Sequence, residues 1–164
     1  MLTTPFTPQR LATRSDNENL LRLIVFEVAG YWLALPITAV IKVIPCPVII
    51  SNNNQGVGMV NLGSAVVSVV DLQFRFTSKS LVDPQFLILT VSQRREVFAI
   101  PTDRVPGMVE VSLEQILPLP AAYRQIDALG LCSHMATLEQ EKVTIYLLDV
   151  GSFTIDVTKQ LPHG

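Results

Sequence analysis

Charge is scarce in this chain of 164 residues, because Asp, Glu, Lys and Arg make up only 16% of it and the net charge is −2. The twelve basic residues form no cluster, so the sequence lacks the basic patch that nucleic-acid binding requires. We therefore expect no nucleic-acid partner. Hydrophobic residues make up 49% of the chain, a share that indicates much buried or partner-covered surface.

Cysteine is also rare. Cys46 and Cys132 have neither the density of a disulfide scaffold nor CxxC spacing. Both fit a reducing cytosol, where we expect each to be a small buried hydrophobe. With His134 they do not form the spacing of a metal site. The sequence thus predicts a cytoplasmic protein without a metal or other cofactor.

An uninterrupted hydrophobic helix is missing as well. Residues 23–41 are nearly as apolar as a membrane span, but Glu27 lies within them and Pro36 would break a helix. The N-terminus also lacks a signal peptide's order of charge, apolar run and cleavage site. We expect no direct membrane insertion.

The strongest local pattern is a hairpin signal, GMVNLGSAVVSVVDL, over residues 58–72. Its first strand ends on Asn61, and its second strand, which is rich in Val, closes on Asp71. Gly63 supplies the turn between them, because glycine adopts a positive φ without steric cost. A weaker echo, VTIYLLDV, occurs near the C-terminus.

This echo indicates an internal repeat in two parts. Asp149 matches Asp71 at an offset of 78, whereas FAIPTDRV matches LALPITAV with Pro101 on Pro36 at an offset of 65. The second copy must therefore carry about 13 additional residues between its halves, since the two offsets differ by that amount. Residues 113–129 have room for them.

Strand patterns fill both copies, and helix signals are few. Ser112 and Gln115 form a capping box, which predicts a short helix over 113–117, and 121–127 fits a second helical turn. Strands are expected over residues 20–28, 31–35, 40–44, 58–62, 65–72, 86–91, 97–100, 108–111, 129–135 and 143–148. The pattern predicts an all-β protein of two similar small barrels, each too small to bury a large core alone.

We expect one folded domain over residues 20–155. Residues 1–19 show no hydrophobic periodicity and predict a flexible N-terminal tail, and 156–164 predict a short C-terminal tail.

Several stretches carry a resemblance to a known family. They read LIVFEVAGYWLALPITAVIKVIP and GMVNLGSAVVSVVDL in the first copy, then FAIPTDRVPGMVEV, SLEQILPLP and GLCSHMATLEQEKVTIYLLDV in the second. This order, most specific in the spacing of ALPI, GxxNL and VVDL, resembles the CheW-like domain, the coupling module of bacterial chemosensory systems. The resemblance covers residues 21–153.

The resemblance implies two intertwined five-stranded SH3-like barrels, related by a pseudo-twofold axis, with a hydrophobic groove between them. It implies no enzyme activity and an adaptor role with two partners. One is the regulatory domain of a CheA-type histidine kinase, itself CheW-like, and the other is the cytoplasmic tip of methyl-accepting chemoreceptors, a helical hairpin laid in a groove. Swimming chemotaxis and pilus-driven motility are both compatible outputs.

The chain departs from the family pattern at five positions. The family reads N-L-R-G in the central hairpin, where this chain has Gly63 and Ser64 in place of the last two residues, and V-x-E-V where it has Lys42 in place of the acid. Ser68 replaces a proline and Gln73 a basic residue. The resemblance implies that the missing acid and arginine interact near the partner surface, so both members of that pair are absent together.

The resemblance places the partner surface on a set of strand and turn residues: Val40, Lys42, Val43, Gly58, Asn61, Leu62, Gly63, Val105 and Met108. For the four aliphatic residues outside the hairpin, a place in the core is an equally good interpretation. Two other functions stay open for the chain. It could be a small-ligand-binding sensor with the groove as its pocket, or a structural array subunit that does not couple to a kinase.

Catalytic patterns are weak. Cys132 and His134 are two residues apart, on one face of a predicted strand, but no orienting group or oxyanion site accompanies them. Asp71 and Asp149 occupy equivalent positions, where carboxylates more often cap equivalent turns than share an active site. We expect no catalytic residue and no enzyme.

Overall fold

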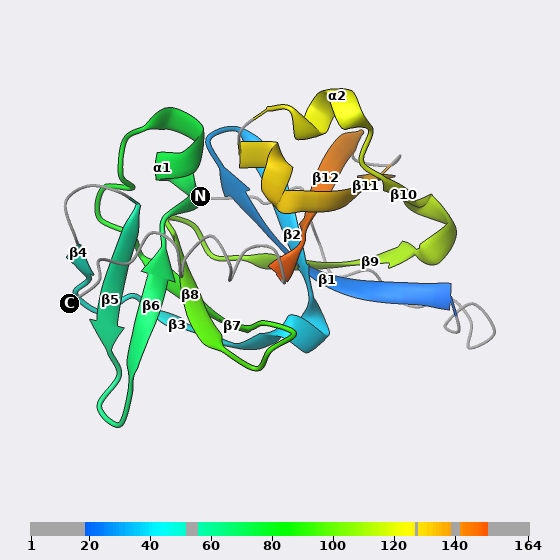
Figure 1. The fold of residues 1–164 in the computed structure, drawn as a ribbon. Coiled ribbons are helices and arrows are strands. Elements are labelled where there is room, and N and C mark those ends of the chain that lie inside the picture. The colour runs from blue at the N-terminus through cyan, green and yellow to red at the C-terminus, as the bar shows by residue number, and fades with distance from the viewer. Residues whose placement is uncertain (1–18, 52–55, 127, 139–141, 151–164) are drawn as a thin grey trace.

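The computed structural model describes residues 19–51, 56–126, 128–138 and 142–150 (Figure 1). Nearly all of the two predicted tails lie outside these ranges, as do the centres of the predicted polar loop at 51–56 and of the turn at 139–142. These expectations stay predictions.

Strands dominate the described residues, as the alternating and β-branched patterns predicted. The helices are short: α1 (Leu72–Thr77), α2 (Ala121–Arg124) and the 3-10 turns η2 (Ile37–Ala39), η3 (Leu113–Gln115) and η4 (Ala128–Leu131). The strands are β1 (Leu20–Val28), β2 (Tyr31–Pro36), β3 (Val40–Pro45), β4 (Ile50–Ser51), β5 (Val57–Asn61), β6 (Val66–Val70), β7 (Phe86–Val91), β8 (Val97–Thr102), β9 (Gly107–Ser112), β10 (Ile116–Pro118), β11 (Cys132–Leu138) and β12 (Val143–Leu148).

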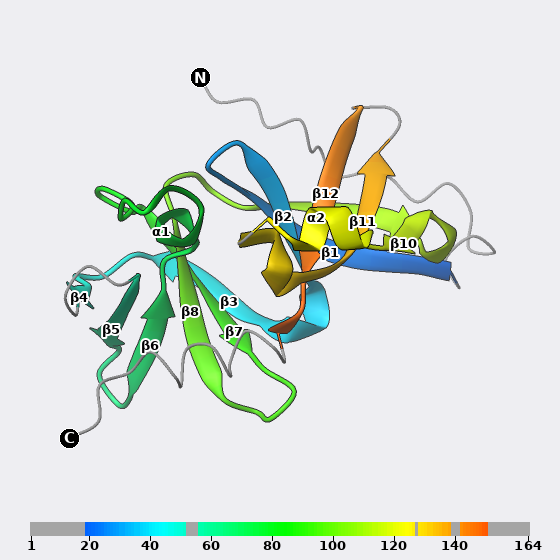
Figure 2. The same ribbon diagram turned by 45° about the horizontal axis from the view of Figure 1, so that its top comes forward.

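The strands form two mixed sheets whose topology is the same after exchange of the two copies. One sheet has the order β3-β7-β8-β6-β5-β4 and the other β9-β1-β2-β12-β11-β10. Each copy therefore gives its first hairpin to the sheet built by the other, which produces two interleaved lobes (Figures 1 and 2). The all-β class and the intertwined double barrel are confirmed; the short β4 and β10 bring each sheet to six strands.

The strand register confirms both offsets of the repeat. Parallel strands join the two copies at β6·β8, where Ser68 pairs with Phe98, and at β2·β12, where Leu33 pairs with Tyr146. Phe98 is 65 residues beyond Leu33, and Tyr146 is 78 residues beyond Ser68. The parallel pairings β6·β8 and β2·β12 are therefore equivalent contacts, one in each sheet.

The additional residues of the second copy lie mostly between β10 and β11. Residues 52–56 connect β4 to β5, whereas residues 119–131 connect β10 to β11 and contain α2 and η4. This connection is eight residues longer than its counterpart, so it holds most of the predicted insertion. The capping box is also confirmed, because Ser112 Oγ accepts from the amide of Glu114 and Gln115 Oε1 accepts from the amide of Ser112.

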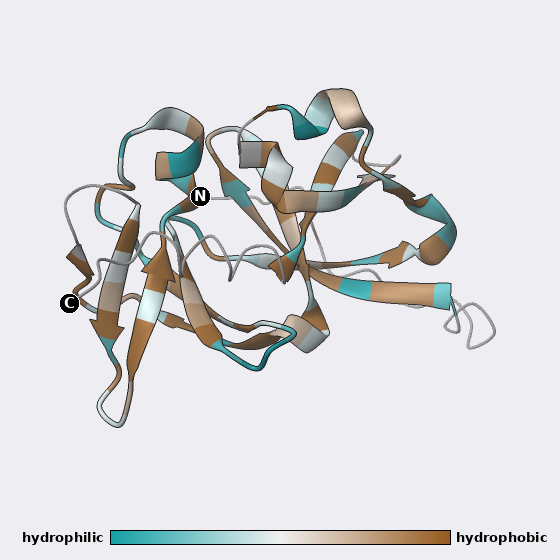
Figure 3. Ribbon diagram, viewed as in Figure 1, coloured by the Kyte–Doolittle hydropathy of each residue, from teal (hydrophilic) through white to brown (hydrophobic). Residues whose placement is uncertain are grey.

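The core has three buried clusters, one of them shared by both sheets. The shared cluster joins Phe26 and Leu35 of one sheet to Ile88 and Ile100 of the other. The other two clusters each lie within a single sheet. Hydrophobic bands cover the strands, and hydrophilic positions gather in the turns (Figure 3). Because the largest cluster needs both sheets, neither lobe has a complete core alone.

Candidate functional site

Strand β3, an edge of its sheet, carries three of the predicted partner-binding residues. Its register shifts between Val40 and Lys42, so the alternation of faces is interrupted there. Ile41, Lys42 and Val43 are consequently all exposed, with exposed fractions of 51% for Ile41 and 37% for Val43. Ile41 was not among the residues that the resemblance indicated, and its exposure follows from a register shift that depends on the pairing with β7.

The tip of the β5–β6 hairpin carries three more of the predicted partner-binding residues. Asn61 Oδ1 accepts a hydrogen bond from the amide of Gly63 at 2.9 Å, and the amide of Leu62 donates to the carbonyl of Ala65 at 2.9 Å. Gly63 has a φ of +90°, as predicted for the turn. Asn61 and Gly63 are exposed, and Leu62 is half-buried against the core of this sheet. Asn61 therefore shapes the tip that presents Gly63.

Gly58 is buried within β5, beside strand β4. A Cβ atom there would lie 2.8 Å from the carbonyl oxygen of Ile50 and 2.9 Å from Ile49 Cγ2, so only glycine lets β4 approach. This packing role was not foreseen from the sequence. A role of Gly58 in partner binding stays a prediction. Gly58 would affect a partner indirectly, by setting the position of β4.

Val105 and Met108 lie before and within β9, in the other sheet. Met108 is the counterpart of Val43 in the repeat, and the exposed fractions of the two residues, 39% and 37%, are nearly equal. Val105 is 52% exposed. A purely core interpretation thus fails for these three residues and holds in part for Val40, which packs against the shared core.

The predicted residues therefore occupy four places: β3, the start of β5 at Gly58, the β5–β6 tip, and β9 with the segment before it. Strands β7 and β8 separate β3 from the β5–β6 hairpin in the sheet. Lys42 and Gly63 consequently do not lie on neighbouring strands. Their shared role in a partner surface stays a prediction.

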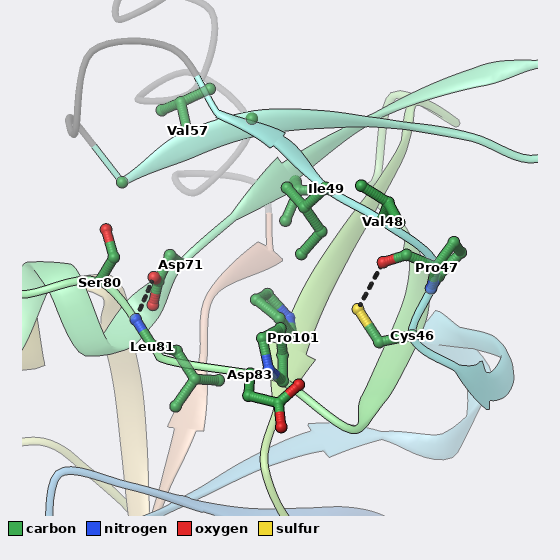
Figure 4. Close-up of a pocket in the computed structure, with 14 residues that line it drawn as sticks. Cys46, Pro47, Val48, Ile49, Val57, Asp71, Ser80, Leu81, Asp83 and Pro101 are labelled. Atoms are coloured by element: carbon green, nitrogen blue, oxygen red, sulfur yellow. Dashed lines mark hydrogen bonds between the residues drawn. The ribbon is translucent and has the colours of Figure 1, made fainter.

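A pocket of about 340 Å³ lies beside this hairpin (Figure 4). Asp71 is on its wall and caps α1, since its Oδ1 accepts from the amide of Phe74 at 3.3 Å. Its Oδ2 accepts from the amide of Leu81 at 2.7 Å. The predicted capping role is confirmed for Asp71. Helix α1 itself was missed, because its six residues, LQFRFT, show no helical periodicity.

The possible Cys–His pair has the wrong chemistry for a nucleophile. Cys132 is buried, and desolvation raises the pKa of its thiol to about 12, which opposes the thiolate that attacks. The register shifts between Cys132 and His134, so the alternation behind their predicted common face is interrupted. Cys132 is the small buried hydrophobe that the sequence predicted, whereas Cys46 is only half-buried and lines the pocket.

Clusters of metal-ligand side chains and membrane-spanning helices are two features that the described ranges lack. Those residues include no group of three or more His, Cys, Asp or Glu side chains placed to hold a metal ion. Over the same ranges, none of the helices has the length and apolar character needed to cross a membrane.

A model of the CheW-like domain matches residues 22–155, which is most of the chain and includes both lobes. The chain belongs to the CheW-like domain family. The family consists of scaffolds and adaptors of chemotaxis signalling, not of enzymes.

The fold of this CheW-like chain is similar to that of the scaffolding protein TtCheW from Thermoanaerobacter tengcongensis. The TM-score is 0.67 at 19% sequence identity, and the match covers 80% of this chain and 85% of TtCheW. No curated protein sequence matches the chain.

Lys42 and Gly63, the two positions where the resemblance implies a charged pair, are both exposed in this CheW-like chain. Ion pairs join Arg22 to Glu110 and Arg104 to Glu27, but Lys42 takes part in none within the described ranges. At Gly63 an added Cβ would meet no atom within 4 Å. Lys42 is therefore an exposed cation, and space for a side chain exists at Gly63.

Proposed function

We propose that this chain is an adaptor that couples chemoreceptors to a CheA-type histidine kinase. The observation that carries the proposal is the family match over residues 22–155, which extends across both lobes and not over one barrel alone. An adaptor must hold two partners at once, and the two lobes offer a separate surface for each.

Exposed apolar side chains support this role. Ile41 and Val43 on β3 and Met108 on β9 lie at sheet edges, Val105 lies just before β9, and all four are between 37% and 52% exposed. Aliphatic groups exposed at a sheet edge suit contact with another β-barrel, such as the CheW-like regulatory domain of the kinase. We propose a cytoplasmic location beside membrane-bound receptor arrays, because the receptor tips are found there.

The small-ligand sensor is the second candidate, and the pocket beside Asp71 is the observation in its favour. Both carboxylate oxygens of Asp71 accept backbone amides, and the pocket opens to solvent. A buried small ligand requires an enclosed cavity with several convergent polar groups. The adaptor role therefore accounts better for the molecule.

Co-sedimentation tests the adaptor role. Membranes that contain chemoreceptors are mixed with the CheA-type kinase of the same organism, with and without this chain. We expect the kinase to sediment with the membranes only when the chain is present. The variant Ile41→Asp/Val43→Asp should weaken this recovery, and Leu113→Asp, a change at an exposed residue on η3, serves as the control. Recovery of the kinase that is independent of the chain would contradict the proposal.

A further inference from the structure

The pocket of Figure 4 has apolar walls and acidic polar groups. It lies where the β3–β4 connection, the start of β5, the end of β6 and the connection from α1 to β7 meet. Val57, Val69, Leu81 and Pro101 contribute to its apolar walls. Its ionisable oxygen groups are the carboxylates of two aspartates, and the described lining residues include no Lys, Arg or His.

Within the described ranges, neither carboxylate forms an ion pair with a cation. The carboxylate oxygens of Asp71 accept hydrogen bonds from the backbone amides of Phe74 and Leu81, which are neutral donors. Asp83 has a φ of 55°, and its backbone carbonyl accepts from Gln85 Nε2 at 2.9 Å. Within the described ranges its carboxylate accepts no hydrogen bond and joins no ion pair. Among the described residues, the pocket lining therefore carries two carboxylates and no counter-charge.

Aliphatic side chains that line the pocket, or lie next in sequence to its lining residues, face water. Val48, which lines the pocket, is 87% exposed, and Val82, which lies between two lining residues, is 84% exposed. Ile50, beside the lining residue Ile49, is 65% exposed. Aliphatic groups exposed on a pocket lining and next to it in the sequence indicate a surface that another molecule covers.

We infer that this pocket binds an arginine or lysine side chain of a partner polypeptide, with aliphatic residues on both sides of that side chain. The methylene stem would pack on the apolar walls, and the cation would pair with the exposed carboxylate of Asp83, since both oxygens of Asp71 already accept backbone amides. The flanking residues would cover Val48 and Val82. A polypeptide fits better than a free amine, because Val82 is exposed outside the pocket lining.

This inference concerns a binding chemistry and does not rest on the proposed adaptor role. The probe is the capped pentapeptide acetyl-Val-Leu-Arg-Leu-Val-amide, titrated into the full chain and followed through backbone amide NMR shifts. We expect saturable shifts at Ser80, Leu81 and Asp83. Replacing the central arginine by neutral citrulline, which has a similar shape, should weaken binding about two- to fivefold, the range for an exposed ion pair. Equal affinity for the two peptides would overturn the inference.

Matched variants test the residues. Asp83→Asn removes the charge and keeps a residue type that tolerates a positive φ, so the fold is preserved. It should weaken binding of the arginine peptide about two- to fivefold, whereas Glu114→Gln, the same charge change in the other lobe, should not. An unchanged affinity of the Asp83→Asn variant would refute the site. Propylguanidine, the free cation, should bind more weakly than the peptide, and equal affinity would rule out a polypeptide occupant.

Discussion

At the scale of single residues, Asp71 joins two segments with one carboxylate. One oxygen caps α1 through Phe74, and the other holds the following connection through Leu81. A carboxylate can serve two donors because it has two acceptor oxygens. The sequence pattern located this residue at the end of a strand, but the second contact is ten residues away, and no local pattern indicates it.

Replacement of Asp71 should destabilise the fold in steps. Asp71→Ala removes both acceptors, and we expect a loss of about 1–3 kcal/mol in the free energy of unfolding. Asp71→Asn keeps one carbonyl oxygen and should lose less. Urea unfolding measures both variants. A change of less than about 0.5 kcal/mol for Asp71→Ala would show that water replaces these contacts.

Cys132 should make stability fall at high pH. Its folded pKa of about 12 lies above the ordinary value of 9.0, so the folded state holds its proton more tightly than the unfolded state does. The resulting stabilisation is complete below pH 9 and is lost as pH rises from 9 toward 12. The loss should approach about 1.4 kcal/mol per pH unit in that window. Cys132→Ala should show a shallower decline in urea unfolding, and identical declines would contradict the burial of a neutral thiol.

Lys42 should favour a partner that supplies an acid. We expect Lys42→Glu to weaken binding of the native partner by about 0.2–1 kcal/mol, the range for an exposed ion pair, and by more if the pair is desolvated. The double variant Lys42→Glu/Gly63→Arg should gain binding to receptors that suit the usual family pair. The space at Gly63 admits the side chain, but its φ of +90° adds strain, so a thermal melt must precede the binding measurement. Unchanged native-partner affinity in a folded Lys42→Glu variant would show that Lys42 is a solvated surface residue.

At the scale of elements, the sequence predicted most strands to within a few residues because their β-branched and alternating patterns are local. The sequence did not predict the features that depend on tertiary contacts between strands. The bulge that exposes Ile41 depends on pairing with β7, and the close approach at Gly58 depends on β4, a strand of two residues. The pocket combines segments from Cys46 to Pro101, so no stretch of sequence contains it.

Gly58 should control the docking of β4. Gly58→Ala would place a Cβ against the backbone of Ile50, and we expect about 1–3 kcal/mol of destabilisation, as for other overpacked sites. Hydrogen exchange should accelerate at Ile50 and Met59, the residues paired between β4 and β5. Gly63→Ala, which meets no neighbouring atom, is the control and should leave exchange at Ile50 unchanged. Equal exchange in both variants would contradict this role of Gly58.

At the scale of the whole molecule, two sequence offsets indicated the two-part repeat. The exchange of hairpins between the sheets explains why the two halves of the repeat have different offsets. Each copy contributes strands to both sheets, so the number of residues between its two halves can differ from one copy to the other. The strand pairs Ser68–Phe98 and Leu33–Tyr146 are nevertheless equivalent in the two sheets. The shared core then fixes the two lobes relative to each other. A rigid pair of lobes with exposed apolar edges is the physical basis of the proposed adaptor role.

Titration calorimetry of this chain with the regulatory domain of the CheA-type kinase from the same organism tests that role most directly. We predict a complex at tens of micromolar or tighter, roughly the weak end of specific association. Its affinity should survive moderate salt, because buried apolar contacts are not screened and rim charges mainly affect the association rate. The absence of any complex at tens of micromolar, with a chain shown to be folded, would contradict the account.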